Sequence, residues 1–130
     1  MKNMVFCDAN IILRYLLRDI ETQFAEAKRL IEKDDIFILN EVAAEVVYVL
    51  IKVYSIEKKK VCAVLKEFYS RDNVHFLSKD IILGAINIFS ESSMDFVDCI
   101  LCSYAAIEDA SVASFDAKVN RYLEKKKNSK

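Results

Sequence analysis

MVFCDANI, residues 4–11, joins a short apolar run to an acid and is the stretch that decides the fold. Four apolar residues in a row are typical of a short strand covered on both faces. Asp8 follows this run directly, and Asn10 lies where a helix is predicted to begin. In α/β proteins, functional groups gather beyond the carboxyl ends of parallel strands. The opening therefore predicts an α/β fold with an acid at a functional edge.

The same alternation of strand and helix continues along the chain. Further apolar runs predict strands at 36–39, 74–77 and 111–114. Helical periodicity predicts helices over 10–17, 21–33, 40–53, 57–69, 79–89 and 94–109, with a last short helix after Asp116. Alternating strands and helices imply a parallel sheet with helices on both faces. We therefore expect three layers, α/β/α, around a short central parallel sheet of about four to five strands.

The composition fits one domain. The chain has 130 residues, of which 54% are hydrophobic and 30% charged, and this length is enough to bury a core. We expect a single domain over residues 1–124 and a basic, frayed tail over residues 125–130. The sequence shows no secretory signal, and no apolar run approaches the roughly 20 residues of a membrane span. The expected location is therefore the cytoplasm, with no membrane partner.

Charge and cysteine content narrow the function classes. The net charge is −1, which disfavours a protein that passively coats nucleic acid but not an enzyme with its acids in one site. Cys99 and Cys102 have C-x-x-C spacing, but a structural zinc site needs two more ligands at compatible spacing. The only histidine, His75, lies in a predicted strand and is expected to be a structural residue. We expect Cys7, Cys62 and this pair to be buried, reduced thiols.

Three acids lie where the predicted fold does not explain them as surface residues. Asp8 and Asp116 each follow a predicted strand, at the edge where function is expected. Asp98 lies within FVDCILC, residues 96–102, a helical stretch that is apolar nearly all round. A buried carboxylate is costly unless it is paired or binds a metal, and no Lys or Arg lies within a turn. The alternatives for Asp98 are a carboxylate facing a solvent cleft and one bonded to a distant cation.

Two further acids have simpler explanations. Asp95 lies in the first turn of its helix, and Ser92-x-x-Asp95 resembles a capping box, so a structural role is expected. Glu45 lies on the polar stripe of the helix after Asn40, and by itself it is a surface acid. If several of these carboxylates converge, they repel one another, and a divalent cation relieves the repulsion. Ligands that are all oxygen favour Mg²⁺ or Mn²⁺ over zinc.

Four segments together resemble the PIN domain family, and within it the VapC toxins. Asp8-Ala9-Asn10-Ile11 resembles the D-[ST]-N-[IV] opening of PIN domains, with Ala9 in place of Ser or Thr. EVVYVL, residues 45–50, is similar to the E-x-x-[WY]-x-L helix of VapC toxins, and DFVDCIL, residues 95–101, to their D-F-x-D-A-L-I segment. Ser114-Phe115-Asp116 resembles their closing T-F-D. The four segments occur in the family's order and span essentially the whole chain.

The resemblance implies a metal-dependent endoribonuclease, the toxin of a VapBC-type toxin–antitoxin module. It implies an acidic site made of Asp8, Glu45, Asp98 and Asp116 that holds one or two Mg²⁺ or Mn²⁺ ions. Asn10 and Ser114 would support this site by hydrogen bonds, and Asp95 would be a peripheral fifth acid. The implied partners are an RNA substrate, a VapB-like antitoxin and a second copy of the chain.

Basic residues near the predicted acids are candidates for RNA binding. Arg14 and Arg18 lie one turn apart on the first helix, and Lys118 and Arg121 follow the last acid. Each of them is ordinarily a solvated surface charge. The predicted homodimer would use apolar surface on two helices, the one with Phe24, Leu30 and Ile31 and the valine-rich one after Asn40.

Rival interpretations differ in which residues they need. A haloacid-dehalogenase-type phosphatase needs D-x-D, but Asn10 occupies the second position. A receiver domain needs adjacent acids near the first strand and a late lysine after a strand, and neither is present. Two alternatives remain: a structure-specific DNA or RNA nuclease of the PIN type outside toxin–antitoxin systems, and an inactive PIN-like interaction module.

Overall fold

The computed structural model describes residues 3–129 and contains a small parallel sheet. Its strands are β1 (Met4–Phe6), β2 (Asp35–Phe37) and β3 (Val74–His75), in the order β1-β2-β3. The register places Val5 beside Ile36 and Ile36 beside Val74. Ile36 and Val74 are completely buried, so this face of the sheet belongs to the core.

The helices agree closely with the ranges predicted from periodicity. Within residues 3–129 they are α1 (Ala9–Leu17), α2 (Glu21–Lys33), α3 (Asn40–Tyr48), the π-helix η1 (Val49–Val53), α4 (Lys58–Tyr69), α5 (Lys79–Glu91), α6 (Phe96–Glu108) and α7 (Ala117–Asn128). One detail differs from expectation. The segment expected to be a frayed tail is helical as far as Asn128, because α7 continues through it. No helix in the described part of the chain is long and apolar enough to cross a membrane.

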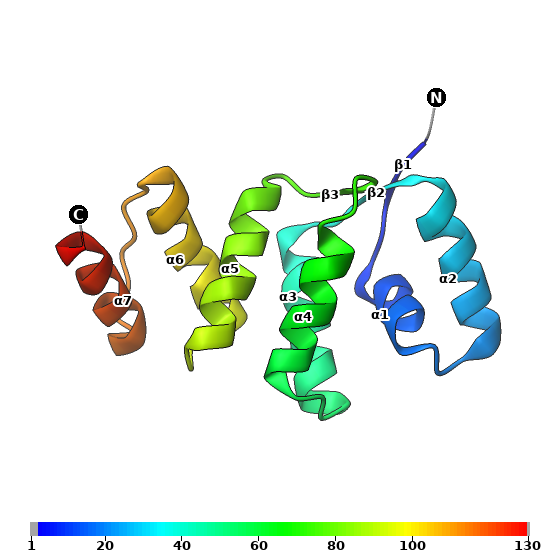
Figure 1. Cartoon of the computed structure of the whole chain (residues 1–130), viewed down its shortest axis with the longest axis horizontal. Coiled ribbons are helices and arrows are strands. Elements are labelled where there is room, and N and C mark those ends of the chain that lie inside the picture. Colours follow the sequence, from blue (N-terminus) through cyan, green and yellow to red (C-terminus); the bar gives the residue numbers. More distant parts are fainter. Residues whose placement is uncertain (1–2, 130) are drawn as a thin grey trace.

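The prediction of four to five strands was wrong. Ser111–Ser114, expected to be the fourth strand, contains no regular structure. Figure 1 shows this segment between α6 and α7, at the opposite end of the long axis from β1. A short apolar run becomes a strand only beside a partner edge, and here the free edge of β1 is out of reach.

The prediction of three layers was also wrong, because only one face of the sheet is covered. Figure 1 shows helices on one side of the strands and none on the other. Residues that alternate with the core positions point away from the helices, and we call this set the outer sheet face: Met4, Phe6, Asp35, Phe37, Leu39, His75 and Leu77. Phe6 is 64% exposed and Leu77 is 80% exposed. Uncovered sheet faces are usually polar, so an apolar one is unusual.

Many of the apolar residues that were expected to provide a dimer surface pack against the core. Ile31 is buried, while Phe24 and Leu30 pack against the core from partly exposed positions. In the valine-rich segment Val46 is buried, while Tyr48 and Val53 are largely exposed. The surplus apolar surface inferred from the sequence therefore lies mostly elsewhere, on the sheet.

The contact between α5 and α6 is very close and depends on the single glycine of the chain. A Cβ atom on Gly84 would lie 2.5 Å from Ser103 Oγ and 2.8 Å from Ile107 Cδ1. Ser103 is completely buried and donates a hydrogen bond to the Ile81 carbonyl at 2.8 Å. The missing side chain therefore lets the two helices approach until a serine of α6 bonds to the backbone of α5.

A buried arginine ties the end of α1 to the end of η1. Arg14 Nη1 lies 3.0 Å from Asp19 Oδ2, and Arg14 Nη2 donates to Tyr54 Oη at 3.0 Å. Tyr54 closes the π-helix through a backbone bond to the Val49 carbonyl at 3.1 Å. Arg14 is only 8% exposed, so this charge is held by its partners rather than by water.

Replacing Arg14 by methionine is expected to destabilise the fold. Methionine keeps most of the side-chain volume but leaves Asp19 and Tyr54 without their donor, and bonds to a charged group contribute about 1.5–3 kcal/mol. Urea unfolding of the wild type and Arg14→Met measures this loss. Arg18→Met, at the exposed end of the same helix, is the control, and an equal loss in both variants would contradict the role given to Arg14.

Candidate functional site

Three acids gather where α6 and α7 begin. Asp95 is the N-cap residue of α6, and Asp98 lies in the first turn of the same helix. Asp116 is the N-cap residue of α7, which packs beside α6. We call Asp95, Asp98 and Asp116 the α6–α7 acid cluster. The family resemblance implied Asp98 and Asp116 as site residues and Asp95 as a peripheral acid, and the fold places all three in one region.

The acids of this cluster act on one another electrostatically. Partial burial raises the pKa of Asp98 above its ordinary value, and the negative charges of Asp116 and then Asp95 raise it further. Among residues 3–129, no Lys, Arg or His side chain forms a salt bridge with Asp98, so no cation neutralises it. Of the two alternatives to a metal ligand, the structure therefore favours a carboxylate at a partly open cleft over one paired with a distant cation.

Asp116 is held firmly by its own helix. Its Oδ1 accepts hydrogen bonds from the backbone N–H groups of Lys118 and Val119, at 2.9 and 3.0 Å. Ser114 supports this turn, since its Oγ accepts from the Asp116 backbone N–H at 2.9 Å. Ser114 thus contacts the Asp116 backbone rather than the carboxylate, and one carboxylate oxygen of Asp116 is used as a helix cap.

Asp95 does not form the capping box suggested by its sequence. It occupies the N-cap position itself, and its side chain makes no capping hydrogen bond. Ser92 Oγ instead accepts from the Met94 backbone N–H at 3.4 Å, within the turn before the helix. Asp95 is exposed, and its carboxylate is not engaged in a helix cap.

Asp8 lies in a different part of the molecule from the α6–α7 acid cluster. Its Oδ1 accepts from the Ile11 backbone N–H at 3.0 Å and caps α1. Asn10, expected to support the site, is exposed in the first turn of α1. Figure 1 shows α1 toward one end of the long axis and α6 and α7 toward the other. A single chain therefore does not bring Asp8 to Asp98.

Glu45 is also separate from the cluster. It is exposed on α3, on the polar stripe that also carries Glu41, Tyr48 and Lys52. Neither Glu45 nor Asp8 is among the groups that raise the pKa of Asp98. Within residues 3–129, no three His, Cys, Asp or Glu side chains are arranged to hold a metal ion. The oxygen donors suit Mg²⁺ chemically, but in one chain their arrangement does not fit it.

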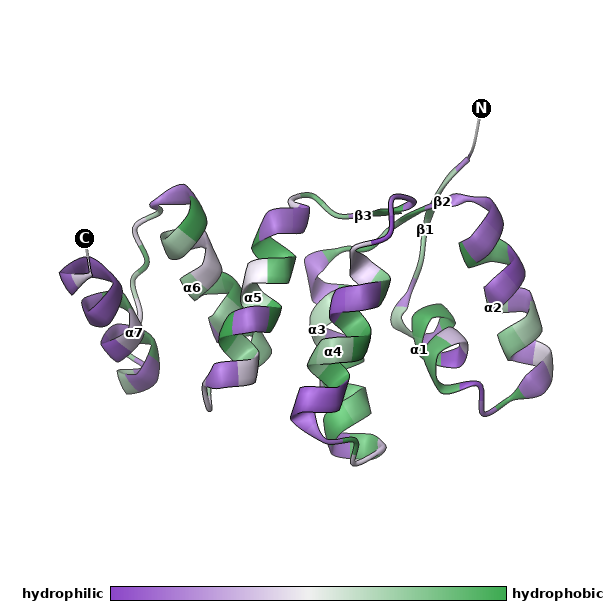
Figure 2. Ribbon diagram, viewed as in Figure 1, coloured by the Kyte–Doolittle hydropathy of each residue, from purple (hydrophilic) through white to green (hydrophobic). Residues whose placement is uncertain are grey.

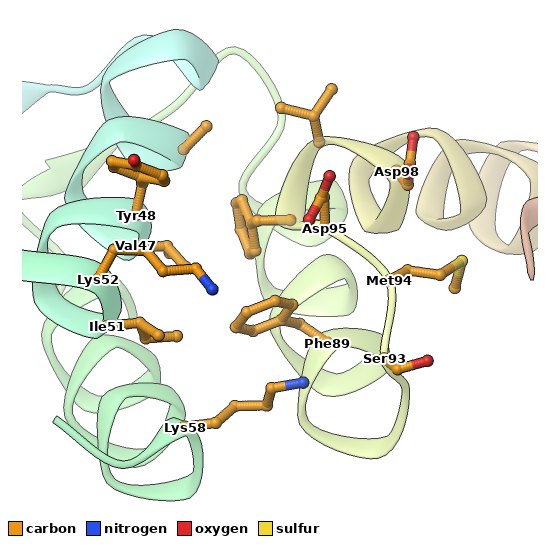
Figure 3. Close-up of a pocket in the computed structure, with 13 residues that line it drawn as sticks. Val47, Tyr48, Ile51, Lys52, Lys58, Phe89, Ser93, Met94, Asp95 and Asp98 are labelled. Carbon is orange, nitrogen blue, oxygen red and sulfur yellow. The ribbon is translucent and has the colours of Figure 1, made fainter. Parts of the chain in front are cut away.

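A cavity of about 580 Å³ adjoins the acid cluster. Figure 3 shows Tyr48 and Lys52 on its α3–η1 wall and Asp95 on the opposite wall, with the amino groups of Lys52 and Lys58 directed into the space between. Lys58 Nζ donates to the Ser92 carbonyl at 2.7 Å and lies 4.5 Å from the centre of the Phe89 ring. The volume is that of a ligand pocket, and an aromatic floor with cations and acids at its rim suits a polar ligand with a flat apolar part.

Lys52 and Lys58 line this cavity and are candidate ligand-binding residues that were not predicted from the sequence. Lys52 shares the stripe of Glu45 and Tyr48, a signal that was visible in the helical periodicity. Lys58 opens a run of three lysines, which is typical of a solvated helix start, and its approach to Phe89 and Ser92 depends on the packing of α4 beside α5. That packing has no signature in the sequence around Lys58.

The four predicted RNA-binding cations lie in different settings. Arg14 is buried and bonded, while Arg18 is exposed, with its guanidinium 5.0 Å from the centre of the Phe24 ring. Lys118 and Arg121 are exposed on α7, and Lys118 Nζ donates to the Ser93 carbonyl at 3.3 Å. Only the α7 pair therefore lies close to the α6–α7 acid cluster.

The expectations for cysteine and histidine are confirmed. All four cysteines are free and buried, and burial is the main factor raising the pKa of Cys99 and Cys102 to about 11. They are therefore protonated thiols at neutral pH. His75 Nε2 lies 3.0 Å from Asp35 Oδ1 on the outer sheet face, so it has a structural partner and no contact with the α6–α7 acid cluster.

The sequence model of the PIN domain family matches residues 5–125, which include all the acids described above. The chain belongs to the PIN domain family. PIN domains are generally nucleases that hydrolyse phosphodiester bonds. Comparisons with curated proteins and with solved structures give no match. The family assignment thus rests on nearly the whole chain. It implies a nuclease-type fold.

Replacing Asp98 by asparagine is expected to leave the metal-free protein at least as stable as the wild type at neutral pH. A raised pKa means that ionised Asp98 opposes folding, and this cost disappears as the pH falls below the ordinary aspartate value. The advantage of Asp98→Asn should therefore be largest at neutral pH and vanish in acid. Thermal melts in EDTA across this pH range measure it.

The control for that experiment is Asp72→Asn, which changes an exposed aspartate in the turn before β3, outside the acid cluster. It should show no such gain at neutral pH. A loss of about 3–5 kcal/mol in Asp98→Asn would instead indicate a broken buried ion pair and would contradict the repulsion described here.

Proposed function

We propose that this PIN domain is an endoribonuclease of the VapC toxin kind. The observation that carries the proposal is the α6–α7 acid cluster, in which unpaired carboxylates repel one another beside an open cavity. Repelling carboxylates in a cleft are costly to fold and are typical of sites that bind or move positive charge. The resemblance of the four acidic segments to VapC toxins supports RNA as the substrate.

The reaction is hydrolysis of one phosphodiester bond. Water adds to phosphorus, the bond to the leaving ribose oxygen breaks, and the products are a phosphate monoester and a free hydroxyl. Asp98 is the best placed proton acceptor for this water, because its raised pKa gives it a higher proton affinity than an ordinary aspartate. Asp116 is fixed by its capping bonds and orients the same water.

The cavity supplies a place for the substrate. A base fits against the exposed ring of Tyr48, and the Lys52 ammonium, which has no ion pair within the described residues, fits a phosphate. Stacking on aromatic rings and contacts from lysine are the usual means of holding single-stranded nucleic acid. Lys118 and Arg121 extend the positive charge along α7 on the other side of the acids.

Divalent metal is a separate part of the proposal. The predicted donors Asp8, Glu45, Asp98 and Asp116 are all carboxylates, which Mg²⁺ and Mn²⁺ prefer. One chain does not gather three of them, so the requirement for metal needs its own test. The separation of Asp8 and Glu45 from the α6–α7 acid cluster also favours the main alternative, an inactive PIN-like interaction module. A structure-specific DNA or RNA nuclease is the other alternative.

The proposed partners follow from the resemblance to toxins. We propose a VapB-like antitoxin whose segment lies in the cavity between α3 and α6, with a basic side chain against Asp95 or Asp98. Such a contact would exclude RNA and offset the negative charge of the acids. We also propose a homodimer, and we place the protein in the cytoplasm with its RNA substrate.

The purified protein is expected to cleave RNA in the presence of Mg²⁺ or Mn²⁺ and to stop in EDTA. Total RNA, transfer RNA and single-stranded DNA of matched length, each with and without metal, are the substrates to compare. Cleavage of DNA at the same rate would favour the general nuclease. Full activity in EDTA would refute the metal requirement alone, and no cleavage under any condition would favour the inactive module.

Two substitutions at Asp8 separate catalysis from helix capping. Asp8→Asn keeps an acceptor for the Ile11 N–H, whereas Asp8→Ala removes it and is expected to cost about 1 kcal/mol of stability. If Asp8 serves the reaction, both variants lose cleavage, but only Asp8→Ala loses stability in urea. Cleavage by Asp8→Asn at the wild-type rate would show that Asp8 is only a cap.

A further inference from the structure

The outer sheet face carries exposed apolar side chains, beside the contact between Asp35 and His75, and the chain leaves them uncovered. The rings of Phe6 and Phe37 pack together on it with centroids 4.8 Å apart, and Leu77 extends it beyond the end of β3. Figure 2 shows hydrophobic colouring along the segment between β3 and α5 and no helix over the strands. Exposed apolar side chains gathered on one face favour a surface that another element covers.

The chain's own last helices cannot cover this face in the arrangement described. α5 packs against α4, and α6 packs tightly against α5 and also contacts α3. The close contact at Gly84 joins α5 and α6 into one unit, so α6 cannot reach the sheet while α5 stays beside α4. The covering element must therefore come from another molecule.

The chain carries a matching surface of its own. Val97 and Leu101 lie one turn apart on α6 and are 57% and 38% exposed. We call this pair the α6 stripe. Asp98 lies next to it, within the first turn of the same helix. A helix with an apolar stripe is the usual cover for an apolar sheet face.

We propose that a second copy of this chain covers the outer sheet face with its α6 stripe, and that the active site forms between the two copies. Because each copy has both surfaces, a twofold axis lets each cover the other. This packing brings α6 of the partner copy to the sheet whose first strand ends in Asp8. Asp8 and Asn10 of one copy then join Asp98 and Asp116 of the other, acids that one chain holds apart.

The arrangement explains why a single chain has an incomplete site. The proposal rests on the proposed function for its catalytic half, but its structural half does not depend on any activity. A second copy is favoured over an unrelated partner because both complementary surfaces lie on the same chain. The proposed dimer interface therefore lies on the outer sheet face, whereas the sequence predicted one on the helix with Phe24, Leu30 and Ile31 and on the valine-rich segment.

Light scattering at micromolar concentration tests the structural half. The wild type is expected to be a dimer, and Leu77→Asp and Val97→Asp, which put a charge on the two surfaces, are expected to be folded monomers. Val53→Asp is the matched control, because Val53 is 64% exposed at the end of the valine-rich segment, and it should remain a dimer. A monomeric wild type, or a dimer that Val53→Asp alone dissociates, would overturn the proposal.

Mixing two inactive variants tests the shared site. Asp8→Asn and Asp98→Asn, unfolded together and refolded as a mixture, form mixed dimers in half of all cases, each with one intact site of two. We therefore expect about a quarter of wild-type cleavage, since every subunit pairing is equally probable. If both acids of a site come from one chain, the mixture stays inactive, and the shared site is refuted.

The two experiments separate failure of this inference from failure of the proposed function. A wild type that forms the expected dimer but cleaves no RNA refutes the nuclease, while the light-scattering result for the interface stands. An active monomer supports the nuclease and overturns the shared site.

Discussion

The contact between α5 and α6 at Gly84 is the constraint on which the rest of the structure depends. Without a side chain at this position the helices approach until Ser103 bonds to the backbone of α5, so α6 takes its place from α5. α5 in turn packs on α4. These successive contacts, α6 on α5 and α5 on α4, determine where Asp98 lies and how the acid cluster forms with Asp116. They also explain why no helix of the same chain covers the outer sheet face.

Capping explains how acids with little tertiary support are still held in place. Asp8 and Asp116 each begin a helix and bond to backbone N–H groups of its first turn. The positive end of the helix dipole attracts a carboxylate at this position, which helps to hold it in place. A capping aspartate is therefore both a structural residue and a fixed carboxylate, and neither role excludes the other.

Local features of the fold could be predicted from the sequence, and long-range ones could not. Helix ranges followed from periodicity and three strands from short apolar runs, because these signals arise within a few residues. Ser111–Ser114 has the same apolar character but finds no partner edge, and strand formation needs one. The single covered face and the approach of Lys58 to Phe89 depend on helix packing far along the chain.

In the candidate site too, local features could be predicted and long-range contacts could not. Asp98 stood out because its helix is apolar, and in the structure its pKa is raised, first by partial burial and then by the charges of Asp116 and Asp95. Its partners were less predictable: Asp116 and Asp95 lie nearby, whereas Asp8 and Glu45, chosen on the same resemblance, lie on other helices. Motif order along a chain reports which residues a family uses but not which molecule of an assembly supplies them.

An apolar sheet face and a divided acidic site have one physical explanation in common. Exposed aromatic and aliphatic side chains favour association, since burial contributes roughly 25 cal/mol for each Å² removed from water. Bringing further carboxylates toward Asp98 opposes association, because like charges repel. Where apolar burial outweighs that repulsion, the hydrophobic effect assembles a cluster of acids that would not form by itself. Such a cluster has a high affinity for positive charge, whether it comes from a cation or from a basic side chain of an inhibitor.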